Sequence, residues 1–133
     1  MSKELIKEML GKKVWAVVGA TPNKSKPANH ILHMLIEYGY EAYAVNPNYD
    51  EIESGIKCYK SIDDLPKVPD VIDIVIPPSA TLESLKSLDS TKFPYIWLQP
   101  GTYNDEIVSY ASTNGFKAIN DGSCVMVSLT LEC

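Results

Sequence analysis

Five short apolar runs, rich in β-branched and aromatic side chains, predict β-strands in this chain. They lie at residues 14–18, 41–45, 71–76, 95–98 and 117–119. Most are nearly continuous instead of alternating, which is typical of strands in a parallel sheet covered on both faces. Glycine, proline or asparagine follows each of the first four runs within two residues, so each ends in a shaped turn.

Segments with apolar residues at helical spacing alternate with these runs. The predicted helices cover residues 1–10, 27–36, 81–88 and 105–114. The alternation predicts a single α/β domain spanning residues 1–133. Its fold is expected to be α/β, a five-stranded, mainly parallel sheet flanked by helices on both faces.

Two segments do not fit this alternation. Residues 50–69 are mixed, with a short capped helical turn expected at residues 61–65. The tail, residues 125–131, is apolar and fits either a strand or a helix. Both assignments are open at this point.

The first strand, the turn at Gly19 and the following helix together predict an anion site. The helix begins near Pro27, and its first unpaired N–H groups and positive dipole end would face the loop. Lys24 and Lys26 add positive charge there. This unit predicts a phosphate cradle, although Gly19 could also be only the tight turn that such a unit needs.

Four turns are expected to converge on one crevice. Right-handed crossovers place all strand-to-helix turns at the same edge of a parallel sheet, where ligands bind in this fold class. The turns comprise residues 19–26, 46–49, 77–79 and 99–103.

Charge and composition narrow the classes of ligand and location. The net charge of −5 argues against nucleic acid as the main partner. No apolar run approaches the roughly 20 residues that span a bilayer, so no membrane association is expected. A cytoplasmic location is expected instead. The chain contains no arginine, so backbone N–H groups and lysine must hold any phosphate. The three cysteines form no CxxC pair and are expected to be reduced thiols.

The common nucleotide motifs do not occur. The dinucleotide fingerprint needs three spaced glycines and an acidic residue that ends the second strand. Gly19 has no glycine partner in its loop, and Asn46 stands where the acid is expected. The GxxxxGK motif is also missing, so neither NAD nor ATP is specifically indicated.

In sequence, the chain resembles the stand-alone CoA-binding domain proteins, and it is similar to the CoA-binding domain that opens the succinyl-CoA synthetase alpha subunit. The resemblance extends from Val14 to about Val127. It is carried by four segments in order: VVGATPNKSKPANHILHMLIEYGY, AVNPNYDEIESGIKCYKSIDDLP, DIVIPP and WLQPGTYNDE.

The resemblance implies a Rossmann-type domain that binds coenzyme A. It places the glycine turn against the phosphates, the turn after the second strand at the adenine and ribose, and the two later turns on the diphosphate and pantetheine side. The residues expected to contact the ligand are Gly19, Ala20, Thr21, Asn23, Lys24, Lys26, Val45, Asn46, Pro47, Ile76, Pro77, Pro78, Gln99, Pro100 and Gly101. Many family members carry an arginine in the loop or early helix, and its absence here leaves the 3′-phosphate without an assigned partner. The phosphorylated histidine and second domain of the synthetase have no counterpart, so no ligase activity is carried over.

Other candidate residues have competing interpretations. His30 and His33 share a helix face, but no carboxylate or cysteine clusters with them, so no metal site is predicted. Cys124 is either a thiol that reacts with the pantetheine sulfur or a buried structural cysteine. Asp73 is either catalytic or a residue at a capped or edge position. No catalytic set is recognisable.

Three functions therefore compete. The first is a protein that binds CoA or acyl-CoA without catalysis of its own, as a carrier, sensor or regulatory subunit. The second is a small NAD(P)-dependent redox or thiol-transfer enzyme. The third is an interaction module with a vestigial crevice, in which the apolar tail and Tyr38, Tyr40 and Tyr43 form a homodimer face or contact another protein.

Overall fold

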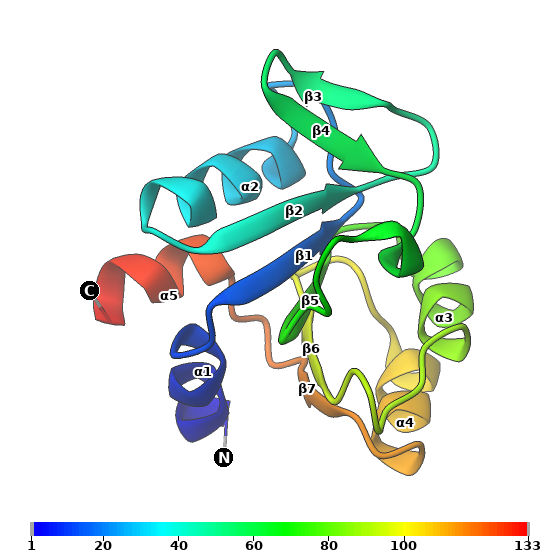
Figure 1. The fold of residues 1–133 in the computed structure, drawn as a ribbon. Helices are drawn as coiled ribbons and strands as arrows, with labels where there is room; N and C mark the ends of the chain where they lie inside the picture. Colours follow the sequence, from blue (N-terminus) through cyan, green and yellow to red (C-terminus); the bar gives the residue numbers. More distant parts are fainter. Residues whose placement is uncertain (1, 133) are drawn as a thin grey trace.

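A computed structural model describes residues 2–132, which form one twisted sheet with helices on both faces (Figure 1). The helices are α1 (Ser2–Leu10), α2 (Pro27–Glu37), η1 (a 3-10 helix, Ile62–Asp64), α3 (Pro78–Lys86), α4 (Asp105–Thr113) and α5 (Val125–Glu132). The strands are β1 (Val14–Val18), β2 (Glu41–Val45), β3 (Glu51–Glu53), β4 (Ile56–Tyr59), β5 (Val71–Ile74), β6 (Tyr95–Leu98) and β7 (Lys117–Ile119).

The sheet has the order β3-β4-β2-β1-β5-β6-β7. All neighbouring strands pair in parallel except β3 and β4, which form an antiparallel hairpin at one edge. The strand order reverses beside β1, because the chain moves outward to β2 and β4 and then returns to β5 on the other side of β1. The α/β, Rossmann-like prediction is confirmed, with seven strands instead of five.

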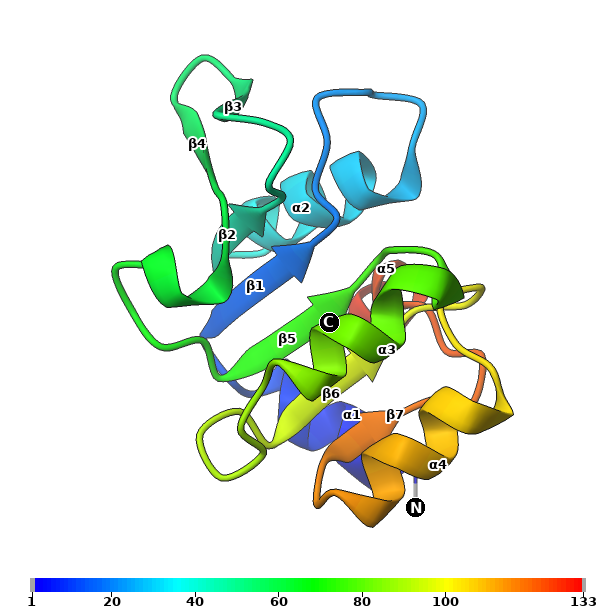
Figure 2. The same cartoon turned by 90° about the vertical axis from the view of Figure 1, so that its right-hand side faces the viewer.

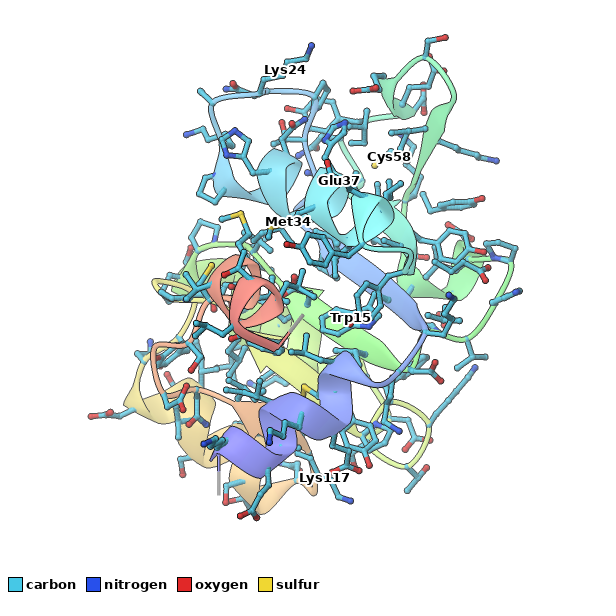
Figure 3. All side chains as sticks on the ribbon, turned by 90° about the vertical axis from the view of Figure 1, so that its left-hand side faces the viewer. Trp15, Lys24, Met34, Glu37, Cys58 and Lys117 are labelled. Atoms are coloured by element: carbon cyan, nitrogen blue, oxygen red, sulfur yellow. The ribbon has the colours of Figure 1, made fainter. Side chains whose placement is uncertain are left out.

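Helices α1, α2 and α5 cover one face of the sheet, and α3 and α4 cover the other (Figures 1 and 2). Trp15 and Trp97 form the centre of the first core, with ring centroids 6.1 Å apart. Figure 3 shows Trp15 on the sheet face among these three helices. Both indole N–H groups are satisfied, since Trp15 donates to the Lys12 carbonyl and Trp97 to the Ser123 carbonyl, each at 2.9 Å. These two large buried side chains therefore have their polar atoms paired, as a stable core requires.

The β3–β4 hairpin was not predicted from the sequence. Its strands are short and carry glutamate and lysine on the exposed side, so only Ile52 and Cys58 are buried. Gly55 makes the turn with a φ of +90°, a conformation that glycine adopts without strain. Charged residues do alternate with the buried positions, but each strand has only three or four residues, too few for the sequence pattern to identify a strand.

Two boundaries also differ from the prediction. Strand β5 ends at Ile74 instead of residue 76, and α3 begins at Pro78 instead of residue 81, with Pro77 as its N-cap residue. Proline suits a first helical turn because that N–H has no partner in the helix. The ambiguous tail is a helix, α5, whose Val125 and Leu129 are buried. Asn104 caps α4, with its Oδ1 accepting from the Ile107 N–H at 2.9 Å.

Within residues 2–132, no helix is both long and apolar enough to cross a membrane.

Candidate functional site

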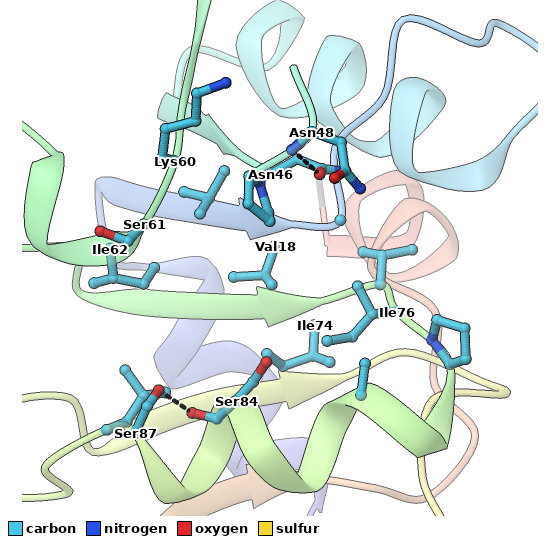
Figure 4. A pocket seen from close by; sticks show the side chains of 17 residues that line it. Val18, Asn46, Asn48, Lys60, Ser61, Ile62, Ile74, Ile76, Ser84 and Ser87 are labelled. Atoms are coloured by element: carbon cyan, nitrogen blue, oxygen red, sulfur yellow. Dashed lines mark hydrogen bonds between the residues drawn. The ribbon is translucent and has the colours of Figure 1, made fainter. Parts of the chain in front are cut away.

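A cavity of about 590 Å³ opens at the carboxyl ends of β1, β2 and β5, on the face of the sheet that α3 covers (Figure 4). Val18 and Ile74 form its floor, the turn after β2 and the start of η1 form one wall, and α3 forms the other. Its lining residues are Val18, Gly19, Val45, Asn46, Pro47, Asn48, Lys60, Ser61, Ile62, Ile74, Val75, Ile76, Pro77, Ala80, Ser84, Ser87 and Leu88. The cavity lies where the strand order reverses, the usual place for a ligand in an open α/β sheet.

Gly19 allows two loops to come together at the mouth of this cavity. Its φ is +99°, and a Cβ atom at this position would lie 2.4 Å from the Val75 carbonyl oxygen and 2.7 Å from Ile76 Cγ2. The Gly19 N–H donates to the Val45 carbonyl at 2.9 Å, which extends the β1–β2 ladder by one bond. Any larger residue would push the loop after β1 away from the loop after β5, so glycine is required here on steric grounds.

Asn46 joins the turn after β2 to its neighbours. Its Nδ2 donates to the Ala20 carbonyl at 2.9 Å, and its Oδ1 accepts from the Asn48 N–H at 2.9 Å. Its backbone N–H donates to the Tyr59 carbonyl at 2.8 Å. The side chain that replaces the expected acid thus holds the first two turns of the crevice in place, and both of its polar atoms have protein partners.

A second hollow, of about 250 Å³, adjoins the first and shares Gly19, Asn46, Asn48 and Val75 with it. It reaches the N-terminus of α2, where Lys26, Pro27 and Ala28 line it together with Thr21 and Tyr49. The N-cap residue of this helix makes no side-chain capping hydrogen bond. The positive end of the α2 dipole and Lys26 both lie at the hollow, an arrangement that favours binding of an anion.

Of the fifteen residues predicted to contact the ligand, the structure brings eight to these two hollows. They are Gly19, Thr21, Lys26, Val45, Asn46, Pro47, Ile76 and Pro77. The other seven line neither hollow in the part of the chain that the structure describes: Ala20, Asn23, Lys24, Pro78, Gln99, Pro100 and Gly101. Ala20 is buried, and Lys24 lies at the outer tip of its loop (Figure 3).

Gln99 is directed to the opposite face of the sheet. Its Nε2 donates to Asp73 Oδ1 at 2.6 Å, and its Oε1 accepts from the Val125 N–H at 3.2 Å. Gln99 is itself buried and thereby joins the centre of the sheet to the start of α5. Its role in the structure is to hold α5, and the ligand contact expected from the sequence stays a prediction.

Asp73 lies in a central strand, so the interpretation of an edge or capped position is wrong. It sits on β5 between β1 and β6, is completely buried, and its Oδ2 has no hydrogen-bond partner. Burial raises the pKa of this carboxyl to about 7, and the hydrogen bond from Gln99 lowers it in part. The carboxyl does not line the two hollows, which separates it from the candidate site.

Sequence reasoning missed the wall formed by η1 and α3. The missed residues include Lys60, Ser61, Ile62, Ala80, Ser84, Ser87 and Leu88. A signal exists for α3, because the helix after the third predicted strand must pass over the switch point once the strand order is known. No pattern in the sequence indicates that Lys60 lies at the site, because its position depends on the β3–β4 hairpin, which was not predicted.

His33, Cys58 and Cys124 line neither hollow. His33 bonds to the Asn29 carbonyl and to Glu53, each at 2.8 Å, which ties α2 to β3. The Asn29 carbonyl and Glu53 together raise its pKa. Among the described residues no group of His, Cys, Asp and Glu is arranged to hold a metal ion. Cys58 is buried, and burial raises the pKa of its thiol, whereas Cys124 is half-buried.

The fold is that of a Rossmann-like α/β protein with two adjoining hollows where the strand order reverses, and comparison with known proteins gives the family. Residues 13–130 match the family described as CoA binding domain. The chain belongs to this family, as its sequence resemblance implied.

The relatives fall into two groups. The chain is 32% identical over 126 residues to an ADP-forming acetate–CoA ligase I of Archaeoglobus fulgidus, matching 87% of this chain but 18% of the ligase. It is 27% identical to an uncharacterized protein of Bacillus subtilis, with 96% of this chain and 93% of that protein covered. The chain thus spans less than a fifth of the ligase relative but nearly all of the small one.

Solved structures agree with the fold. A hypothetical protein from Pyrococcus horikoshii superimposes with a TM-score of 0.87 at 30% identity, covering 98% of this chain and 91% of that one. A conserved hypothetical protein from Pyrococcus furiosus is 43% identical, with a TM-score of 0.79 over 86% of this chain and 97% of that one.

Proposed function

We propose that this chain binds coenzyme A or an acyl-CoA across the two adjoining hollows. The observation that carries the proposal is the continuous crevice over Gly19, in a chain of the CoA binding domain family. The combined space suits an elongated nucleotide, because drug-sized ligands occupy about 300–1,000 Å³.

Two parts of the ligand, the diphosphate and the adenine, have a chemically matched place in this proposal. The diphosphate lies in the smaller hollow, against the N-terminus of α2 and Lys26. The adenine lies in the larger hollow, where apolar side chains such as Ile62 and Leu88 cover its faces. The hydroxyl of Ser84 points into this space (Figure 4), where it meets the polar edge of the base.

We further propose that the chain holds its ligand without transforming it, as a carrier, sensor or regulatory subunit, and that residues 1–133 act as a single binding domain. Among the described side chains that line the larger hollow, only Lys60 is ionisable. General acid–base chemistry needs a titratable group within hydrogen-bond reach of the reacting atoms. The matched region is 18% of the ligase relative, so the similarity does not by itself assign the activity of that enzyme to this chain.

Calorimetric titration tests the proposal. The protein is titrated with CoA, acetyl-CoA, NAD and ATP under the same buffer and salt. The expected result is saturable binding of CoA and acetyl-CoA, and much weaker binding of NAD and ATP. Binding of NAD alone would support the redox alternative, and the absence of binding by all four would overturn the proposal. Incubation with acetyl-CoA, followed by chromatography, is expected to return it unchanged.

An assembly role is a second candidate, favoured by exposed apolar side chains on neighbouring helices. Ile36 and Tyr38 at the end of α2 are 41% and 37% exposed, and Val127 and Leu131 on α5 are 57% and 77% exposed. Tyr40 is half-buried and donates to the Leu10 carbonyl, so it is part of the fold. Light scattering at rising concentration tests this role, and a dimer that Leu131→Glu converts to a monomer is the expected result.

A further inference from the structure

The larger hollow has one cationic side chain among its described lining residues, Lys60. It directly follows β4, and its Nζ donates to the Tyr49 carbonyl at 3.2 Å and pairs with Asp50 Oδ1 at 2.8 Å. Both partners belong to the segment after β2, whose Asn46 and Asn48 also line the hollow. The β3–β4 hairpin thus brings the Lys60 ammonium to the segment after β2, at the rim of the hollow and directed away from its floor (Figure 4).

The carboxyl end of β2 is the place of the ribose in doubly wound nucleotide-binding folds. An acidic residue there accepts a hydrogen bond from a free ribose hydroxyl, whereas a nearby cation accommodates a ribose that carries a phosphate. This chain has the uncharged Asn46 at that point and no arginine anywhere. Asn46 is also engaged with Ala20 and Asn48, which leaves it one neutral N–H donor and no charge to pair with a phosphate.

We propose that Lys60 binds the phosphate on the ribose of the ligand and thereby selects a phosphorylated ribose over an unphosphorylated one. The inference rests on the proposed binding of CoA and assigns the recognition that the missing arginine left without a residue. Lys26 lines the smaller hollow at the α2 N-terminus, so the two lysines occupy different ends of the crevice. The ligand correspondingly has two separate anionic groups, a diphosphate and a single phosphate.

The contacts of Lys60 leave it able to take this role. An ammonium has three donors, and the Tyr49 carbonyl and Asp50 occupy two of them. The Asp50 side chain is 90% exposed and that of Lys60 is 51% exposed. An ion pair this exposed contributes little, so a phosphate with more charge displaces the carboxylate readily. Asp50 is then a competitor that holds Lys60 at the turn until the ligand arrives.

The test compares CoA with dephospho-CoA in calorimetric titrations of the wild type and Lys60→Gln. The wild type is expected to bind CoA about tenfold more tightly than dephospho-CoA. This ratio corresponds to one charge-assisted contact of roughly 1.4 kcal/mol. Lys60→Gln is expected to lose this preference by weakening CoA alone, with dephospho-CoA unchanged. Equal weakening of both ligands, or no change in either, would overturn the inference while the proposed function stands. Failure of the wild type to bind CoA would overturn both.

Two further variants separate the contact from general charge effects. Lys57→Gln removes the same charge from β4, but Lys57 lies over the Tyr59 ring and lines neither hollow. It is expected to retain the preference for CoA. Asp50→Asn removes the competing carboxylate and is expected to tighten CoA severalfold without affecting dephospho-CoA. A loss of the preference in Lys57→Gln as large as that in Lys60→Gln would contradict a specific role for Lys60.

Discussion

Gly19 lies so close to Val75 that a methyl group on the Gly19 Cα would come within 2.4 Å of the Val75 carbonyl oxygen. No side chain fits in this space. The approach joins the loop after β1 to the loop after β5, and the two hollows share both residues. The geometry of the crevice therefore depends on a contact between two backbones, and glycine is the residue that permits it.

Gly19→Ala is expected to lower the free energy of unfolding by about 2–3 kcal/mol, because it adds both a clash and an unfavourable positive φ. It is also expected to abolish CoA binding by separating the two loops. Chemical denaturation and calorimetry measure the two effects. Gly101→Ala is the matched control, since Gly101 has a φ of +87° but a Cβ at this position would meet no atom within 4 Å. It is expected to cost about 1 kcal/mol and to leave CoA binding intact.

Asp73 is expected to make stability depend on pH. The pKa of its carboxyl is about 7 in the folded protein, well above that of an ordinary aspartate. Between about pH 4 and pH 7 the folded state therefore keeps a proton that the unfolded chain has lost. The contribution of Asp73 to the free energy of unfolding thus falls as pH rises through this window and is constant above it.

Asp73→Asn tests this dependence, because the amide is neutral at every pH and can still accept from Gln99. The stability difference between the variant and the wild type is expected to shift in favour of the variant by on the order of 3–4 kcal/mol from pH 4 to pH 7. Denaturant titrations at a series of pH values measure it. A difference that stays constant over this range would show that Asp73 is ionised in the folded protein.

Gln99→Leu tests whether Gln99 serves to hold α5 or to bind the ligand. The substitution leaves Asp73 Oδ1 and the Val125 N–H without their partners, so it is expected to cost about 2–4 kcal/mol of stability. Hydrogen exchange is expected to accelerate in α5. Affinity for CoA is expected to be unchanged, because Gln99 does not line either hollow. A large loss of affinity for CoA, with the α5 amides still protected from exchange, would show instead that Gln99 contacts the ligand, as the sequence predicted.

Asn46→Asp tests the turn after β2. The carboxylate still accepts from the Asn48 N–H but repels the Ala20 carbonyl, which loses its donor. The variant is expected to lose about 1–2 kcal/mol of stability. It is expected to bind CoA more weakly, since the new charge repels a phosphorylated ribose, and titrations with CoA and NAD measure the change. Asn48→Asp adds the same charge to the turn without removing the donor to Ala20, so it measures the effect of the charge alone. The difference between the two variants is then the structural part of the effect.

The sequence was sufficient for the fold class and for the parts of the site that belong to the turns. Gly19 and Pro47 each follow a strongly apolar strand, and such local patterns predict strand ends well. The family resemblance added the ligand, and the family match supports that addition.

The remaining parts depend on long-range relationships that local patterns do not contain. Lys60 reaches the crevice only because the β3–β4 hairpin folds back so that β4 pairs in parallel with β2, and charged residues alternate with its buried positions. Gln99 follows a strand at the same edge as the other turns, but its side chain points to the opposite face. Side-chain direction at a strand end depends on the register and on α5, whose helical state was itself ambiguous in sequence.

An amide NMR titration of the uniformly labelled protein with CoA tests most directly whether the crevice is the CoA site. We expect chemical-shift changes concentrated at Gly19, Ala28, Asn48, Ser61 and Ser84, which surround the two hollows. Little change is expected in α1 and β7, which lie away from them. Changes centred on α5, or a spectrum that CoA leaves unaltered, would contradict the claim that this crevice is a CoA site.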